Sequence, residues 1–286
     1  MPKSNRMSDK ILSGLIYFCA ALSVVILVGI IGYVFVKGIG QVNWSFLTSV
    51  TSVLYGTVGI AGNILNTLYI IVITMVIAAP IGIGSAIYLN EYAKPGKLVT
   101  IIEFATETLS GIPSIIFGLF GMMFFVQTLN MGYSILAGSL TLILMVLPLI
   151  TRNTQEALKT VPDSYRVGAI GLGSGKWHMI RTILLPSALP GIITGVILAV
   201  GRIVGESAAL LFTAGSAKIL PKVLSGYLGK IMQSGGTLTV QLYLSATSES
   251  DFDTAFGIAV VILILVFLIN LGTKALAKKH DVYRKD

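Results

Sequence analysis

Arg202 and Glu206 are the residues of this sequence best suited to chemistry, because both are charged and both lie in a mainly apolar segment. A guanidinium offers a planar fork of donors that fits an oxyanion. A carboxylate can accept a hydrogen bond from an oxyanion that still carries a proton. The i,i+4 spacing predicts that the two side chains pair on one face of a helix.

Two interpretations of this pair are open. A charge in the middle of a membrane costs at least about 2.5 kcal/mol on insertion scales, and pairing lowers that cost. The pair is therefore either a structural ion pair that locks helices together or part of the path of an anionic substrate. Gly191 and Gly195 precede the two charges by 11 residues, close to three helical turns. We therefore expect the charges to continue a small-residue face that packs closely on a neighbouring helix.

The elements that must position these residues are long apolar segments. The 286-residue chain is 55% hydrophobic and 11% charged, whereas soluble domains carry about 25% charged residues. About 20 apolar residues in a helix cross the hydrocarbon core of a bilayer. Six segments approach or exceed that length: 11–36, 64–89, 108–129, 133–150, 188–212 and 255–271. The sequence predicts an all-α, polytopic integral membrane protein with six transmembrane helices, the first of them retained because no signal-peptide cleavage site follows it.

The distribution of Lys and Arg predicts the orientation of these helices. Most of the 20 basic residues lie in the termini and after the second and fourth apolar segments. Basic residues accumulate on the cytoplasmic side, so we expect both termini in the cytoplasm. This bias accounts for the net charge of +8, and nucleic-acid binding is not implied. Cys19 is the only cysteine, which excludes an internal disulfide or a Cys-based metal site.

Two features are expected on the outer side. Segment 217–232 carries apolar side chains near helical spacing, which predicts an amphipathic helix at the membrane surface. An acidic patch, formed by Glu249, Asp251 and Asp253, precedes the last apolar segment. It either docks an external partner or is a solvated loop that ends in a helix cap at Asp253.

Segment 165–186 lies between the fourth and fifth apolar segments and is longer than a simple turn requires. Gly173 suits the left-handed turn that ends one short helix. The next helix is expected to bring Trp177, Ile180 and Leu184 to one side. Two short helices at an angle form a rigid elbow with an apolar face, which favours docking on another protein. The alternative is a plain connecting loop with cytoplasmic positive charge.

Residues 171–176, Gly-Leu-Gly-Ser-Gly-Lys, have the composition of a nucleotide-binding loop without its spacing. In the motif G-x-x-x-x-G-K-[ST] the first glycine would stand at Ile170, and Trp177 replaces the hydroxyl residue that binds magnesium. We therefore expect this chain to bind no cofactor and to be no enzyme, with ATP and Mg held by a partner ATPase. No constellation of His, Asp or Cys predicts an intramembrane enzyme.

The same region resembles the EAA loop of bacterial ABC importer permeases. The matching residues are Glu156, Tyr165, Arg166, Ala169, Gly173, Trp177, Ile180 and Pro186. The family's Glu-Ala-Ala after Tyr-Arg is Val167-Gly168-Ala169 here, so the glutamate that the family uses at this point is missing. The resemblance implies that residues 151–187 form a cytoplasmic coupling loop that docks on ATPase subunits.

Four further segments, 87–92, 111–118, 190–195 and 202–208, resemble the permeases of phosphate-specific ABC importers. The first of them is more similar to the A-type than to the C-type of their two permease subunits. The resemblance implies a type I ABC importer permease fold in the bacterial inner membrane, with a first helix and outer loop in 1–60, a transmembrane domain in 61–275 and a basic cytoplasmic tail in 276–286.

The same resemblance implies that the chain carries inorganic phosphate into the cell, with Arg202 and Glu206 on the substrate path. The implied partners are a C-type permease, a homodimeric ATPase subunit and an external phosphate-binding protein, besides membrane lipid.

Other transport functions remain as alternatives. A divalent anion that enters against a potential of 100 mV faces roughly 4.6 kcal/mol, twice the value for one charge, so a passive channel could not concentrate it. Permeases for molybdate or sulfate share the coupling loop and stay possible. An ion-coupled secondary anion transporter is also possible, but six spans without an evident inverted repeat fit it poorly.

Overall fold

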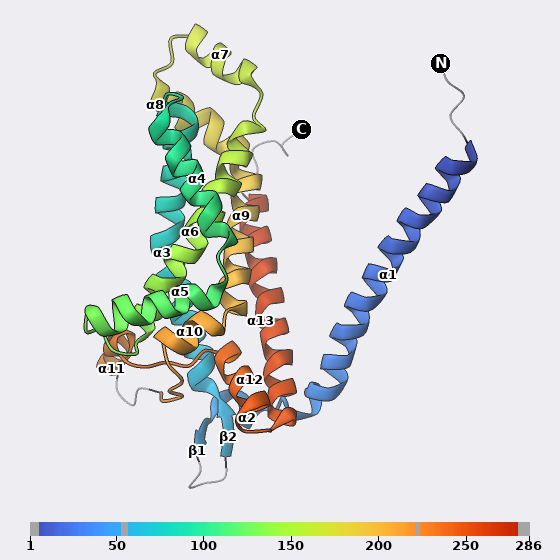
Figure 1. Ribbon diagram of the computed structural model, residues 1–286, viewed down its shortest axis with the longest axis vertical. Helices are drawn as coiled ribbons and strands as arrows, with labels where there is room; N and C mark the ends of the chain where they lie inside the picture. The colour runs from blue at the N-terminus through green and yellow to red at the C-terminus, as the bar shows by residue number, and fades with distance from the viewer. Residues whose placement is uncertain (1–5, 53–56, 221–223, 280–286) are drawn as a thin grey trace.

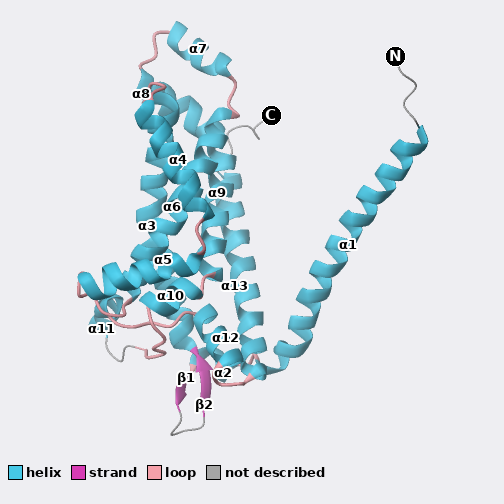
Figure 2. Ribbon diagram, in the orientation of Figure 1, coloured by secondary structure: helices cyan, strands magenta, loops and turns pink. Residues whose placement is uncertain are grey.

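The computed structural model describes residues 6–52, 57–220 and 224–279, most of them helical. Figure 2 shows helices joined by loops, with one short hairpin in which β1 (Val50–Ser52) pairs antiparallel with β2 (Thr57–Ile60). The expected all-α class is confirmed. Of the basic tail predicted at 276–286, residues 280–286 lie outside the described residues, and Lys279 is the last residue of α13.

Within the described residues, five helices are long and apolar enough to cross a membrane. They are α1 (Arg6–Gly38), α3 (Ala61–Ile87), α6 (Ile135–Lys159), α9 (Leu185–Gly205) and α13 (Phe252–Lys279). Figure 1 shows the last four running along the long axis of the molecule, while α1 leans away and meets α13 near one end only. Five of the six predicted spans therefore correspond to these helices, with changed ends.

The third predicted span is bent in the structure. α4 (Lys97–Gly111) and α5 (Ser114–Gly121) make an angle of 102° across a short break. Ile112 takes the extended conformation because Pro113 disfavours the helical region for the residue before it. The span predicted over 108–129 is therefore not one helix, and its first arm begins earlier than predicted, at Lys97. α4 lies alongside α6, and α5 runs across the bundle (Figure 1).

The fifth predicted span is also interrupted. α9 ends just before Glu206, and a separate helix, α10 (Ala208–Thr213), follows. α10 packs across α5 so closely that a Cβ atom at Gly118 would lie 2.8 Å from the Cα atom of Ala209. The prediction of one continuous helix over 188–212 was wrong, and Glu206 lies between two helices rather than within one.

The main core lies where α3, α6 and α9 pack together. Its fully or nearly buried side chains include Ile70, Leu142, Met145, Ile150 and Ile203. The glycine face predicted on α9 does pack on its neighbour α6. A Cβ atom at Gly191 would lie 2.6 Å from the Cβ atom of Ala157, and one at Gly195 would lie 2.7 Å from that of Asn153. Only glycine permits this approach of the two helices.

The end of the bundle that carries β1 and β2, here called the hairpin end, also holds several short helical elements. They are η1 (Ile39–Gln41), α2 (Trp44–Thr48), α11 (Leu224–Gly229), η5 (Lys230–Met232) and α12 (Leu238–Thr247). Of the amphipathic helix predicted over 217–232, residues 217–220 are not helical, 221–223 lie outside the described residues, and the rest forms α11 and η5. Lys230 is buried and donates a hydrogen bond to the carbonyl of Ser234 at 3.1 Å.

The acidic patch at the hairpin end is bound within the chain. Glu249 accepts hydrogen bonds from Lys218, Gln241 and Ser245 at 2.8–3.1 Å. Burial raises the pKa of Glu249, but these bonds outweigh burial and hold the pKa below its usual value. The helix cap predicted at Asp253 was wrong, because Asp251 accepts from the backbone N–H of Thr254 at 3.0 Å.

Candidate functional site

The end of α9 separates Arg202 from Glu206. Arg202 lies in the last turn of α9, whereas Glu206 follows the helix in an extended conformation with φ −82° and ψ 121°. The two residues therefore do not share a helix face, and within the described part of the chain they form no ion pair with each other. The predicted i,i+4 pair was wrong, because a helix that ends between the two residues removes the geometry that the spacing assumes.

Glu206 has a structural partner instead. Its Oε1 atom accepts a hydrogen bond from the backbone N–H of Ala209 at 3.0 Å, so it caps the first turn of α10. Its backbone carbonyl accepts from the hydroxyl of Thr239 at 2.9 Å, and the residue is 8% exposed. These contacts hold the Glu206 carboxylate at the break between α9 and α10.

The guanidinium of Arg202 is available to a ligand. The residue is partly buried in α9, yet its side chain makes neither a hydrogen bond nor an ion pair with any part of the chain that the structure describes. An arginine carries five N–H donors, and leaving them without partners at membrane depth is costly. An oxyanion would satisfy several of these donors at once.

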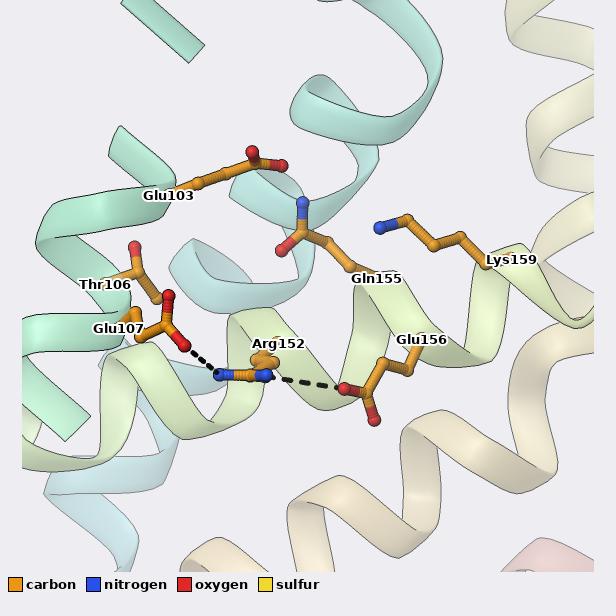
Figure 3. A pocket seen from close by; sticks show the side chains of 7 residues that line it. All are labelled: Glu103, Thr106, Glu107, Arg152, Gln155, Glu156 and Lys159. Carbon is orange, nitrogen blue, oxygen red and sulfur yellow. Dashed lines mark hydrogen bonds and ion pairs between the residues drawn. The ribbon is translucent and has the colours of Figure 1, made fainter. Parts of the chain in front are cut away.

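A second charged site lies between α4 and α6, in a cavity of about 270 Å³. Figure 3 shows acidic side chains from α4 facing basic and acidic side chains from α6. The lining residues are Glu103, Thr106, Glu107, Arg152, Gln155, Glu156 and Lys159. The cavity is therefore polar along one side of the helix pair.

Arg152 makes only long contacts in this cavity. Its Nη1 atom lies 3.7 Å from Glu107 and its Nε atom 3.4 Å from Glu156, with 54% of the side chain exposed. Exposed pairs of this kind are worth at most about 1 kcal/mol, so neither carboxylate holds Arg152 firmly. Sequence reasoning treated Arg152 only as a cytoplasmic charge. The i,i+4 spacings of Glu103 with Glu107 and of Arg152 with Glu156 are the signals that could have identified two facing charged surfaces.

The elbow consists of α7 (Asp163–Gly171), α8 (Lys176–Met179) and a π-helical segment, Ile180–Leu184. Gly173 has φ +80°, and the N–H groups of Gly173 and Ser174 donate to the carbonyls of Ile170 and Ala169. This is the left-handed helix ending predicted at Gly173, and that prediction is confirmed. The end of the bundle that carries the elbow is called the elbow end below.

The apolar face of the elbow is not the predicted one. Ile180 and Leu184 are fully buried because the π-helical segment packs on α6 and α3 as part of a small core. The exposed apolar side chains are instead Val167, Ile170, Leu172 and Trp177, with Leu172 91% exposed. The elbow therefore exposes four apolar side chains, and the surface that they contribute is called the docking face below, after the role we propose for it.

The other residues matched to the EAA loop are spread over several elements. Glu156 lies on α6 in the charged cavity, and Pro186 lies in the first turn of α9, which continues directly from the elbow. Tyr165 is exposed and Ala169 is buried. Arg166 is directed inward, where the hydrogen bond to Glu91 raises its pKa further above the usual value and keeps it charged.

The fold and the site together define a multi-pass membrane transport component. Residues 78–281 match the family of binding-protein-dependent transport system inner membrane components. The chain belongs to that family, and its type I ABC importer permease fold is confirmed.

Individual relatives and one solved structure agree with this assignment. The probable ABC transporter permease protein YqgI of Bacillus subtilis (strain 168) is 41% identical over 212 residues, covering 74% of this chain and 72% of that protein. The phosphate transport system permease protein PstA of Xylella fastidiosa (strain Temecula1 / ATCC 700964) is 31% identical over 246 residues, covering 86% and 84%. A bacterial alginate ABC transporter, solved with an alginate pentasaccharide-bound periplasmic protein, has a TM-score of 0.65 at 14% identity, covering 97% of this chain and 99% of its own.

Proposed function

We propose that this chain is a permease subunit of an ATP-driven importer that carries inorganic phosphate into the cell. The observation that carries the proposal is the guanidinium of Arg202, which has no partner within the described part of the chain although it lies in a membrane-spanning helix. A relative named phosphate transport system permease protein supports phosphate as the anion. The chain moves substrate, and ATP hydrolysis belongs to a partner.

Three residues of the path have distinct roles in this proposal. Arg202 binds the phosphate oxygens through its fork of N–H donors. Glu206 keeps one carboxylate oxygen on α10 and uses the other to accept a hydrogen bond from P–OH, which disfavours sulfate. Arg152, nearer the elbow end and held only by long ion pairs, receives the anion after it leaves Arg202.

The proposal assigns each end of the bundle a side of the bacterial inner membrane. The elbow end is cytoplasmic, with both chain termini, because most basic residues outside the spans lie there. The docking face binds a homodimeric ATPase subunit, which holds ATP and Mg, and the hairpin end receives phosphate from an external binding protein. A second, C-type permease closes the path, because the cavity beside Arg152 is open to the side of this single chain.

The test is transport by the assembled complex in vesicles that contain ATP. We expect uptake of radiolabelled phosphate that unlabelled phosphate blocks and that equal concentrations of sulfate or molybdate leave nearly unchanged. Competition by molybdate or sulfate would assign the chain to another oxyanion. Uptake that follows an imposed ion gradient in the absence of ATP would identify a secondary transporter and overturn the proposal.

A further inference from the structure

Arg166 is bound inside the protein rather than presented on the docking face. Its Nε and Nη2 atoms donate to Oε1 of Glu91 at 3.3 and 2.9 Å. Its Nη1 atom donates to the carbonyl of Val161 at 3.1 Å and to Asp163 at 3.0 Å, and Nη2 also donates to the carbonyl of Leu158 at 3.0 Å. One guanidinium thus joins the end of α6, the start of α7 and Glu91.

Glu91 lies in the π-helical segment Tyr88–Tyr92, which continues α3 at the elbow end. Its side chain is 5% exposed, and the Oε1 atom that binds Arg166 also accepts from Asn90 at 2.8 Å. The next residue, Tyr92, has its ring centroid 4.8 Å from Nζ of Lys176, a favourable cation–π distance. The end of α3 therefore contacts both helices of the elbow.

These contacts matter because the covalent chain joins the elbow only to α6 and α9. Glu91 and Arg166 are 75 positions apart, so α3 can follow the elbow only through noncovalent contacts. Ile83 and Ile87 of α3 add apolar contacts to the elbow core. Apolar contacts have no preferred direction, whereas two charged hydrogen bonds between buried groups hold a defined geometry.

We propose that Glu91 and Arg166 are positioning residues that make α3 move together with the elbow. This inference rests on the proposed function, in which the ATPase displaces the docking face. α3 packs along α6 and also contacts α9, the helix that carries Arg202. A displacement of the elbow then reaches the Arg202 site from two sides, through α9 by covalent connection and through α3 by this pair. The junction contains two π-helical segments, Tyr88–Tyr92 and Ile180–Leu184, which are frequent at functional sites.

The experiment compares variants in the purified, assembled complex and counts anions transported per ATP hydrolysed. Glu91→Gln keeps the shape of the side chain and removes its charge. We expect this ratio to fall at least about tenfold, because hydrogen bonds between charged groups are among the stronger ones. Glu91→Asp keeps the charge and is expected to lose less. Asp163→Asn is the matched control: it removes another carboxylate from the same arginine, but one that is 92% exposed, and the ratio should not change.

The ratio separates coupling from simple stability, because transport per ATP hydrolysed does not depend on how much complex assembles. A merely structural role would lower the amount of complex and leave the ratio intact, and that result would overturn the inference. If Glu91→Gln does not assemble, Arg166→Lys decides, since it keeps the charge but loses the fork. An unchanged ratio in Arg166→Lys would again refute the coupling role. Should the wild-type complex import another oxyanion, the substrate assignment fails while the ratio remains measurable with that anion.

Discussion

Two arginines illustrate how the elbow end differs from the middle of the bundle. Arg166 makes five hydrogen bonds to protein acceptors, whereas Arg202 makes none within the described residues. A saturated guanidinium has no donors left for a ligand and fixes the shape of its surroundings. A guanidinium without partners can bind a passing anion and release it. The contacts of Arg166 therefore fix the geometry of the elbow end, whereas the donors of Arg202 are free for the ligand that we propose.

The largest expected effect tests the middle of the bundle. Arg202→Gln should lower phosphate uptake at least about 100-fold, because two charged hydrogen bonds of about 1.5–3 kcal/mol each are lost. The ATPase should still copurify with the complex, since Arg202 is remote from the docking face. Uptake and copurification are measured on the same preparation. Full uptake in this variant would remove the functional contrast between the two arginines.

The next largest effect is expected at the elbow end, where a substitution should weaken ATPase binding and leave phosphate binding intact. Leu172→Asp should weaken ATPase binding by about 30-fold, the loss of roughly 2 kcal/mol for one buried leucine. Phosphate binding by the permease pair should not change. Leu172→Met is the matched control, because it keeps the apolar volume. Normal ATPase binding to Leu172→Asp would mean that the docking face lies elsewhere.

An intermediate effect is expected for Arg152, whose two ion pairs are long and exposed. Arg152→Gln should reduce uptake by about tenfold, the loss of one charged hydrogen bond, without lowering the amount of complex. Glu107→Gln should leave uptake at or above the wild-type level, since it removes a carboxylate that competes with the anion for Arg152. Equal losses in both variants would show that the cavity serves stability and not transport.

The smallest expected effect concerns the local stability of the elbow, whose fixed geometry distinguishes it from the region of Arg202. Gly173→Ala places a side chain at φ +80° and should lower the local stability of the elbow by about 1–2 kcal/mol. Gly171→Ala is the control, because Gly171 lies in α7 with open space around it and alanine favours helix. Hydrogen exchange of the elbow amides measures both. Faster exchange in Gly171→Ala than in Gly173→Ala would contradict the helix ending described at Gly173.

Much of this protein follows from local sequence. The apolar lengths predict six membrane-spanning segments, five of which correspond to long apolar helices of the structure. The spacing of Gly191 and Gly195 predicts close packing on a neighbour, and Gly173 predicts the turn within the elbow. Each of these depends on the residue itself or on helical periodicity, which a single segment already contains. The resemblance of segment 165–186 to a coupling loop likewise lies within one continuous stretch.

The missed features depend on what a segment meets in space. Proline at 113 was visible, but only packing against α6 and α10 turns the break into a bend of 102°. Ile180 and Leu184 share a face with Trp177 in an ideal helix, yet a π-helical segment directs them inward. The cavity beside Arg152 arises because α4 places two glutamates opposite α6.

By itself, the sequence determined the class of protein, the number of apolar segments and the presence of an elbow between two of them, because hydrophobicity and turn chemistry act locally. The tertiary structure decided which charges have partners. Arg166 pairs with Glu91, although 75 positions separate them in the sequence. Arg202 and Glu206 are only four positions apart and do not pair, because the helix ends between them. Pairing depends on distance in space, and sequence spacing predicts that distance only while the helix continues.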